Sequence, residues 1–159
     1  MGSEDRHGFP RTLYGYVTAS FSFIDLLSGY CYGDRMSQTK RMRRLLVDYM
    51  GASRDAAAVA VKLWRHTLMH TGNPWTLVER SSRKRYSWLL HWREHLPRDQ
   101  HMKLQPPPGG EVLNVSLLYL VDDLLSGAQQ LFADVGGSAA LRKRARRVHS
   151  KVSAPSLNV

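Results

Sequence analysis

The stretch that decides the fold is residues 55–74, DAAAVAVKLWRHTLMHTGNP. It opens with an aspartate suited to the positive end of a helix, as a cap or first-turn acid, and continues through alanines that favour the helix. It stops at residues 71–74, TGNP, where a residue suited to a left-handed cap comes shortly before a proline that cannot continue the helix. The pattern predicts a helix over residues 55–69, with His70 in or just after its last turn.

Two further helices are predicted before this stretch. Residues 12–32 are rich in aromatic and aliphatic side chains at helical spacing and indicate a buried helix that ends near Gly33. Residues 40–50 indicate a second helix, for which Ser37 or Thr39 is a suitable cap. The predicted apolar faces are Tyr16, Phe23, Leu26, Leu27 and Tyr30 in the first helix, and Met42, Leu45, Leu46 and Tyr49 in the second.

The chain changes character after the stretch. Residues 86–92, YSWLLHW, are β-prone and prolines follow them, so a small β-hairpin or irregular insert is predicted over about residues 75–115. A short strand is predicted within it at residues 112–115. Residues 116–132 then repeat apolar residues at helical spacing and predict a fourth long helix.

The C-terminal residues are cationic and show no core pattern. Gly136-Gly137 should break the fourth helix, and residues 141–147, LRKRARR, indicate a frayed helix followed by a disordered end. We therefore expect a single domain over residues 1–135 and a basic extension over residues 136–159. The expected fold class is mainly α, with four to five helices and the small insert between the third and fourth.

Composition limits the classes of function. Lys and Arg number 23 against 13 Asp and Glu, and a formal charge of +10 should attract phosphate polymers, so nucleic acid is the first partner to consider. Such a charge also serves solubility alone. The single cysteine, Cys31, excludes an intrachain disulfide and suits a reducing interior. We expect a cytoplasmic protein with no signal peptide, no membrane span and no cofactor, since no phosphate-loop or zinc-finger pattern occurs.

Residues 65–70, RHTLMH, carry the clearest chemical pattern: an arginine, a polar residue, three more residues and a histidine. The pattern resembles the motif of the HEPN superfamily, helical-bundle domains that often act as metal-independent ribonucleases. The aromatic helix ending in residues 29–33, GYCYG, the basic second helix and the motif-bearing third helix are similar to the order of elements in such bundles. The resemblance covers roughly residues 12–135. It implies a HEPN-like bundle, a homodimer with paired motifs, and RNA cleavage that leaves a 2',3'-cyclic phosphate.

The side chains of the motif suit this chemistry. A histidine, whose pKa is ordinarily near neutral, takes a proton from a ribose 2'-hydroxyl or gives one to the leaving 5'-oxygen, and His70 is the candidate. Arg65 offers a charged planar fork that matches phosphate oxygens and stabilises charge in the transition state. His66 is an auxiliary candidate. Because five residues of α-helix separate Arg65 and His70 by about 140° around the axis, the two need a cleft rather than a flat face.

Structural roles for the same residues stay open. Arg65 would then pair with Asp48, Asp55 or Asp122, and His70 would hydrogen-bond a turn carbonyl and close the helix.

Four histidines are candidate metal ligands. His66 and His70 are four residues apart, as are His91 and His95, and each pair is half of a zinc-binding helix. Thr67 stands where the pattern His-Glu-x-x-His has its glutamate, and no carboxylate lies at a supporting spacing, so we expect no metal.

Three basic runs are expected to contact the RNA backbone, with Tyr86, Trp88 and Trp92 as base-stacking candidates that more often serve the core. The nucleic-acid-binding candidates are Arg41, Arg43, Arg44, Arg83, Lys84, Arg85, Arg142 and Arg144. The expected function is an RNA-binding, HEPN-like, metal-independent endoribonuclease of a toxin, defence or stress system, with RNA and a protein partner or antitoxin. The alternative is a non-catalytic dimeric interaction module that binds nucleic acid or a protein partner.

Overall fold

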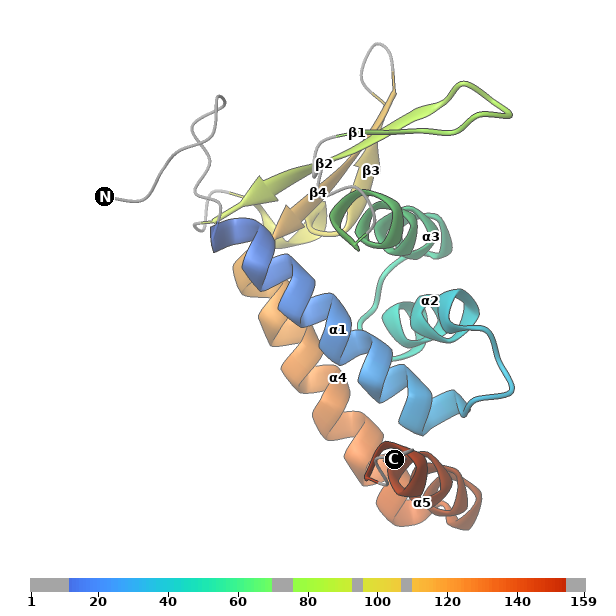
Figure 1. The fold of residues 1–159 in the computed structure, drawn as a ribbon. Coiled ribbons are helices and arrows are strands. Elements are labelled where there is room, and N and C mark those ends of the chain that lie inside the picture. Colours follow the sequence, from blue (N-terminus) through green and yellow to red (C-terminus); the bar gives the residue numbers. More distant parts are fainter. Residues whose placement is uncertain (1–11, 70–75, 93–95, 107–109, 154–159) are drawn as a thin grey trace.

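The protein is mainly helical and carries a small four-stranded sheet (Figure 1), which confirms the coarse fold class. The computed structural model describes residues 12–69, 76–92, 96–106 and 110–153. The elements are α1 (Thr12–Tyr32), α2 (Gln38–Asp48), α3 (Arg54–Leu63), the π-helical turn η1 (Trp64–Met69), β1 (Thr76–Val78), β2 (Arg85–His91), the 3-10 turn η2 (Arg98–Gln100), β3 (Lys103–Gln105), β4 (Glu111–Ser116), α4 (Leu117–Gly137) and α5 (Ala139–Ser153).

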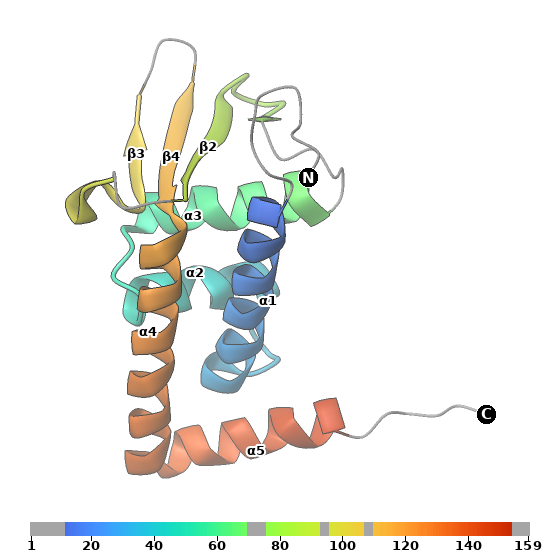
Figure 2. The ribbon, with the colours of Figure 1, turned by 90° about the vertical axis from the view of Figure 1, so that its left-hand side faces the viewer.

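The two long helices organise the molecule. α1 and α4 run side by side away from the sheet, and α5 crosses their far end (Figures 1 and 2). α2 and α3 pack on one another, α2 also packs on α1, and α3 contacts strands β2, β3 and β4. The largest fully buried side chains come from α1, α2, α3, β4 and α4. They are Phe21, Ile24, Met42, Leu45, Leu46, Leu63, Leu113, Leu120 and Leu131, with Val17, Val61 and Val115.

The buried face predicted for α1 is wrong in most of its members. Tyr16, Phe23 and Leu26 are 53%, 40% and 39% exposed, and of the predicted set only Leu27 belongs to the core. The core is instead contacted by Leu13, Val17, Phe21, Ile24, Leu27 and Cys31. The reason is that α1 is apolar around most of its circumference, so its spacing does not single out one face.

The insert is a sheet of order β1-β2-β4-β3, larger than the hairpin predicted there. β1 and β2 form an antiparallel hairpin, β2 and β4 are parallel, and β3 is antiparallel to β4. Trp88 lies opposite Leu113 in the parallel pair, and both are buried. Two parallel strands need a long crossover, so their pairing joins segments far apart in sequence, which local patterns do not reveal.

The other helices lie close to their predicted ranges. The apolar residues Met42, Leu45 and Leu46 of α2 are buried as predicted. α4 begins after Ser116, whose hydroxyl accepts from the backbone N–H of Tyr119, and ends at Gly137. α5 is a regular helix over Ala139–Ser153 that packs on α1 and α4, where only a frayed helix was predicted. None of the helices in the described ranges is both long and apolar enough to cross a membrane.

Candidate functional site

The motif lies on a turn whose winding differs from that of the helix before it. α3 ends at Leu63, and residues 64–69 continue as the π-helical turn η1. The turn is fixed from inside by Trp64, which is 4% exposed and stacks on Phe21 of α1 with ring centroids 6.0 Å apart. Thr67 is also buried, and its hydroxyl donates to the carbonyl of Leu63. Hydroxyl bonds of this kind bend helices, and π turns occur often at functional sites.

The π winding changes which residues face the same way. In an α-helix, residues five apart are separated by about 140° around the helix axis. In a π-helix the backbone hydrogen bonds join residues five apart, so the angle between two such residues is smaller. Trp64 and Met69 are such a pair within η1. A π-helical turn therefore brings two side chains five residues apart towards the same side of the helix, where both can contact one ligand.

Arg65 is half-buried and is held by a neutral group. Its Nη1 donates to the Thr39 hydroxyl at the start of α2, at 2.6 Å. The ion pair predicted with Asp48 is not made, because Asp48 accepts from the Tyr32 hydroxyl at 2.6 Å and lies 3.6 Å from Arg44. Among the described residues no carboxylate pairs with Arg65. Within the described ranges its positive charge has no counter-charge.

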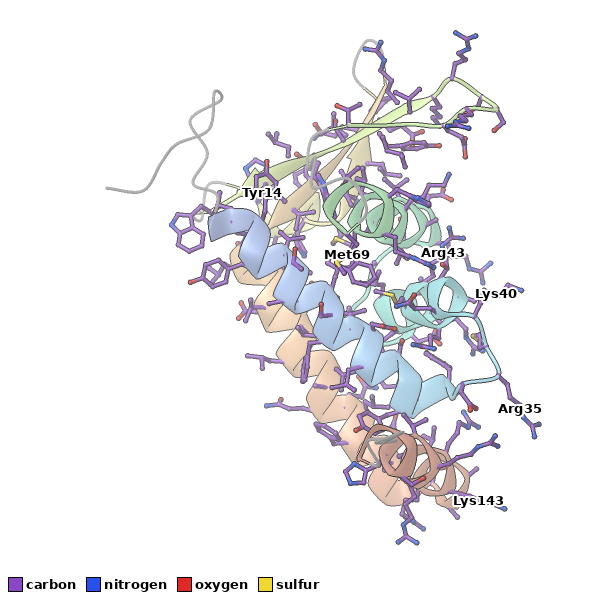
Figure 3. All side chains as sticks on the ribbon, viewed as in Figure 1. Tyr14, Arg35, Lys40, Arg43, Met69 and Lys143 are labelled. Atoms are coloured by element: carbon purple, nitrogen blue, oxygen red, sulfur yellow. The ribbon has the colours of Figure 1, made fainter. Side chains whose placement is uncertain are left out.

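A second guanidinium lies on the same side of α2. Arg43 follows Thr39 by four residues, and residues at this spacing share a helix face. The Nε of Arg43 is buried and has no hydrogen-bond partner in the described part of the chain. Arg43, Lys40 and Met69 are labelled in Figure 3. Arg65 on η1 and Arg43 on α2 have no carboxylate partner in the part of the chain that the structure describes, and two such arginines form a setting that attracts an anion.

Of the two histidines of the motif, the structure describes only His66. His66 is exposed on η1. His70 lies outside the described residues, so its predicted place in or after the last turn stays a prediction.

The remaining arginines of the first basic run bind within the protein. Arg41 lies 2.7 Å from Asp25 of α1, and its Nε donates to the Ser28 hydroxyl at 3.2 Å. The guanidinium of Arg44 lies 4.6 Å from the centre of the Tyr32 ring. Both of these arginines thus contact side chains of α1 and help to hold the two helices together.

The second basic run lies apart from the other two. Arg83, Lys84 and Arg85 belong to the β1–β2 hairpin, which projects from the sheet end in Figure 1. Lys84 forms an ion pair with Glu111, and this hydrogen bond raises the pKa of Lys84. Arg142 and Arg144 of α5 donate to backbone carbonyls at helix ends, of Gly136 and Cys31. The hairpin cations therefore lie apart from α2, whereas Arg44 of α2 and Arg144 of α5 line one pocket beside Tyr32.

The aromatic candidates divide in the same way. Tyr86 and Trp88 are 8% and 7% exposed and serve the core, so they are unsuited to stack on unpaired bases. Trp92 is 50% exposed and contacts Tyr16, with ring centroids 5.4 Å apart.

One polar cluster was not predicted from the sequence. His101 is buried, its Nδ1 accepts from the backbone N–H of Ser116 at 3.1 Å, and its Nε2 lies 3.3 Å from Asp123. Arg98 also pairs with Asp123. Nδ1 of His101 is engaged by the backbone, whereas Nε2 faces Asp123 at 3.3 Å without forming a hydrogen bond in the described part of the chain, so the cluster holds the insert on α4. No sequence pattern links these residues, because the sheet brings them together.

Metal ligands do not gather in the described part of the protein, where no three His, Cys, Asp or Glu side chains lie close enough to hold an ion. Of the four histidines that are candidate zinc ligands, His70 and His95 lie outside the described residues.

No family model, no curated protein and no solved structure matches this chain.

Proposed function

We propose that this protein is an HEPN-like RNA-binding protein that cleaves RNA without a metal, with Arg65 and His70 as the central pair and His66 as an auxiliary. The supporting observation is Arg65 itself. Its guanidinium is held at 2.6 Å by a hydroxyl, on a π-helical turn, with no carboxylate partner among the described residues. An arginine fixed in this way is prepared to bind a phosphodiester with its remaining donors.

The proposed reaction uses only the RNA and these side chains. The ribose 2'-oxygen attacks the neighbouring phosphorus, a base takes the 2'-proton, and the bond from phosphorus to the 5'-oxygen breaks. An acid gives a proton to the departing 5'-oxygen, and the products are a 2',3'-cyclic phosphate and a 5'-hydroxyl. His70 carries one of the two protons, while Arg65 stabilises the charge that develops on the phosphate oxygens.

The test is cleavage of a mixed single-stranded RNA in excess chelator, followed by analysis of the fragment ends. We expect cyclic-phosphate ends from the unmodified protein. Arg65→Ala and His70→Ala should each lower the cleavage rate at least about 100-fold, the lower limit typical of a lost acid or base. Arg54→Ala and His149→Ala are matched controls on α3 and α5 and should cleave normally. Unchanged rates in both motif variants would refute the proposal.

A second candidate function is favoured by the exposed apolar surface of the two long helices. Leu125 and Phe132 of α4 are 56% and 61% exposed, and Tyr16 and Phe23 of α1 add to this surface. Such surfaces mark interaction sites in soluble proteins. The candidate is a dimeric module that binds nucleic acid or a protein partner without cleaving RNA. Tight RNA binding with RNA left intact after long incubation would favour it.

A further inference from the structure

A basic cavity lies at the end of the molecule away from the sheet. It forms between the end of α1, the loop that follows and α5, and has a volume of about 400 Å³. This size falls within the range of small-molecule sites. The motif turn η1 follows α3, which contacts the sheet, whereas α5 lies at the opposite end of α1 (Figure 2). The cavity is thus separate from Arg65.

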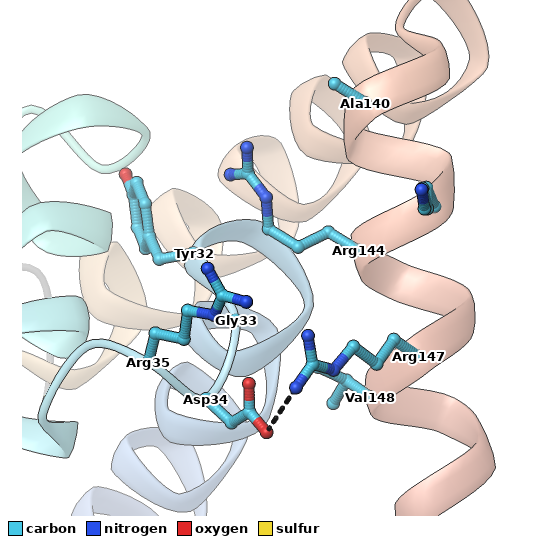
Figure 4. A pocket seen from close by; sticks show the side chains of 9 residues that line it. Tyr32, Gly33, Asp34, Arg35, Ala140, Arg144, Arg147 and Val148 are labelled. Atoms are coloured by element: carbon cyan, nitrogen blue, oxygen red, sulfur yellow. Dashed lines mark ion pairs between the residues drawn. The ribbon is translucent and has the colours of Figure 1, made fainter.

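Positive charge dominates the cavity wall. Arg35, Lys143, Arg144 and Arg147 line it, against a single carboxylate, Asp34. Asp34 lies 3.7 Å from Arg147 in a pair whose side chains are 37% and 53% exposed, so solvent screens this interaction. Figure 4 shows Arg35 and Arg144 on either side of the cavity and the guanidinium of Arg147 directed towards Asp34. Like charges gathered in this way repel one another, and an anion between them would relieve the repulsion.

Part of the cationic wall is rigid before any ligand arrives. The Nη1 of Arg144 donates to the carbonyl of Cys31 at 2.7 Å, which fixes the guanidinium across the last turn of α1. Gly33 follows with a φ of +77°, and a Cβ at this position would lie 3.3 Å from Cγ of Arg144. A glycine here lets the arginine stem pass close to the backbone. A donor held in place loses little freedom when it binds a ligand.

Apolar and aromatic side chains line the same cavity between the cations. Ala140 and Val148 lie on α5, the helix that carries Lys143, Arg144 and Arg147, and Tyr32 lies at the end of α1. Cations together with an aromatic side chain suit a ligand with a phosphate group and a planar ring.

We propose that this cavity is a nucleotide-binding site, in which Arg35, Lys143 and Arg144 hold the phosphate and the ring of Tyr32 receives the base. The shared chemistry is a phosphorylated nucleotide, either free or at the 5' end of an RNA strand. The site does not depend on the proposed cleavage at Arg65.

Titration calorimetry on the full chain at low salt tests the site with 5'-AMP, adenosine and inorganic phosphate. We expect 5'-AMP to bind more tightly than either fragment. The double variant Arg35→Gln/Lys143→Gln should weaken 5'-AMP binding at least about tenfold, since it removes two charged donors. Both side chains are at the surface, so the fold should persist, which circular dichroism checks. Arg146→Gln is the matched control, because it removes a charge from α5 outside this cavity and should change the affinity less than about twofold.

Each outcome decides the proposal. No binding of 5'-AMP at millimolar concentration, equal binding of adenosine, or equal losses in Arg146→Gln and the double variant would overturn it. Competition by a 5'-phosphorylated RNA decamer but not by its 5'-hydroxyl counterpart would assign the site to strand ends. Equal, weak competition by both decamers, with 5'-AMP binding retained, would assign it to free nucleotides. Cleavage assays on the double variant keep the result distinct from the function of the motif.

Discussion

Asp123 shows how one side chain joins the insert to the helical part. It projects from α4 and pairs with Arg98 of η2, and His101 lies 3.3 Å away. Burial raises its pKa, but the interactions with His101 and Arg98 outweigh this effect, so the pKa lies below the ordinary value of 3.8. The folded protein therefore favours the charged form more than the unfolded chain does.

This lowered pKa predicts a dependence of stability on pH. A group whose pKa is lower in the folded state stabilises it fully above the unfolded pKa, and loses this contribution as the pH falls through the folded value. We expect the difference in unfolding free energy between the unmodified protein and Asp123→Asn to be constant above about pH 5 and to shrink towards pH 3. Denaturant unfolding at a series of pH values measures it. Asp122→Asn, at the exposed neighbouring position, is the control, and an equal pH dependence there would contradict the assignment.

Single residues were the hardest level to predict from the sequence. The motif arginine, Arg65, is a candidate from its spacing to His70, but its partner Thr39 is not predictable from the sequence, because 26 positions separate the two residues. Cys31, Gly33 and Arg144 gave no sequence signal of a shared cavity, since 113 positions separate Cys31 from Arg144. Contacts of this kind depend on tertiary packing, which no local pattern encodes.

At the scale of elements, a single capping hydrogen bond to the side chain of Ser53 stabilises the start of α3. The Ser53 hydroxyl accepts from the backbone N–H of Ala56 at 3.2 Å. Ser37 occupies the same position before α2, but its side chain makes no capping hydrogen bond. The two serines thus form a natural comparison.

We predict that Ser53→Ala lowers the free energy of unfolding by about 1 kcal/mol, as expected for a lost capping bond. Ser37→Ala, which removes a hydroxyl that caps nothing, should cost no more than about 0.5 kcal/mol. Urea unfolding of the three proteins compares them directly. If both variants lost the same stability, the capping bond at Ser53 would not be what stabilises α3.

Element positions were predictable where a strong start or stop was present. Ser116 and Gly137 bound α4, and the range 12–32 predicted for the first helix matches α1. The π winding of η1 was not predictable, since the run from Asp55 to Met69 shows ordinary helical spacing and no residue marks the change. The sheet was underestimated because its parallel pair depends on distant segments.

At the scale of the whole molecule, the exposed apolar surface of α1 and α4 is the feature that most needs a partner. An apolar helix is normally covered on all sides, whereas α1 exposes Tyr16, Phe23 and Leu26 beside Val121 and Leu125 of α4. A second copy of the chain is the expected cover, in line with the homodimer that the resemblance to HEPN domains implies.

We predict that the purified protein is a dimer by light scattering and that Leu125→Glu/Phe132→Glu is a monomer at the same concentration. Both side chains are more than half exposed, so the charges should not disturb the core of one subunit. Their burial against a partner without compensation would be strongly unfavourable. Ser126→Glu, at an exposed neighbouring position on α4, should remain dimeric. A monomeric unmodified protein would refute the prediction and leave the surface for another partner.

The hydrogen bond from Arg144 to the last turn of α1 also fixes when the cavity can form during synthesis of the chain. Synthesis proceeds from the N-terminus, so the helix that is made first waits for a residue 113 positions later before its end is closed. A nascent chain that has released only α1 to α4 leaves the Cys31 carbonyl open to water and lacks one wall of the nucleotide cavity. The cavity is thus assembled only after α5 has been made, and a ligand that fills it distinguishes chains with a folded α5 from chains that lack it.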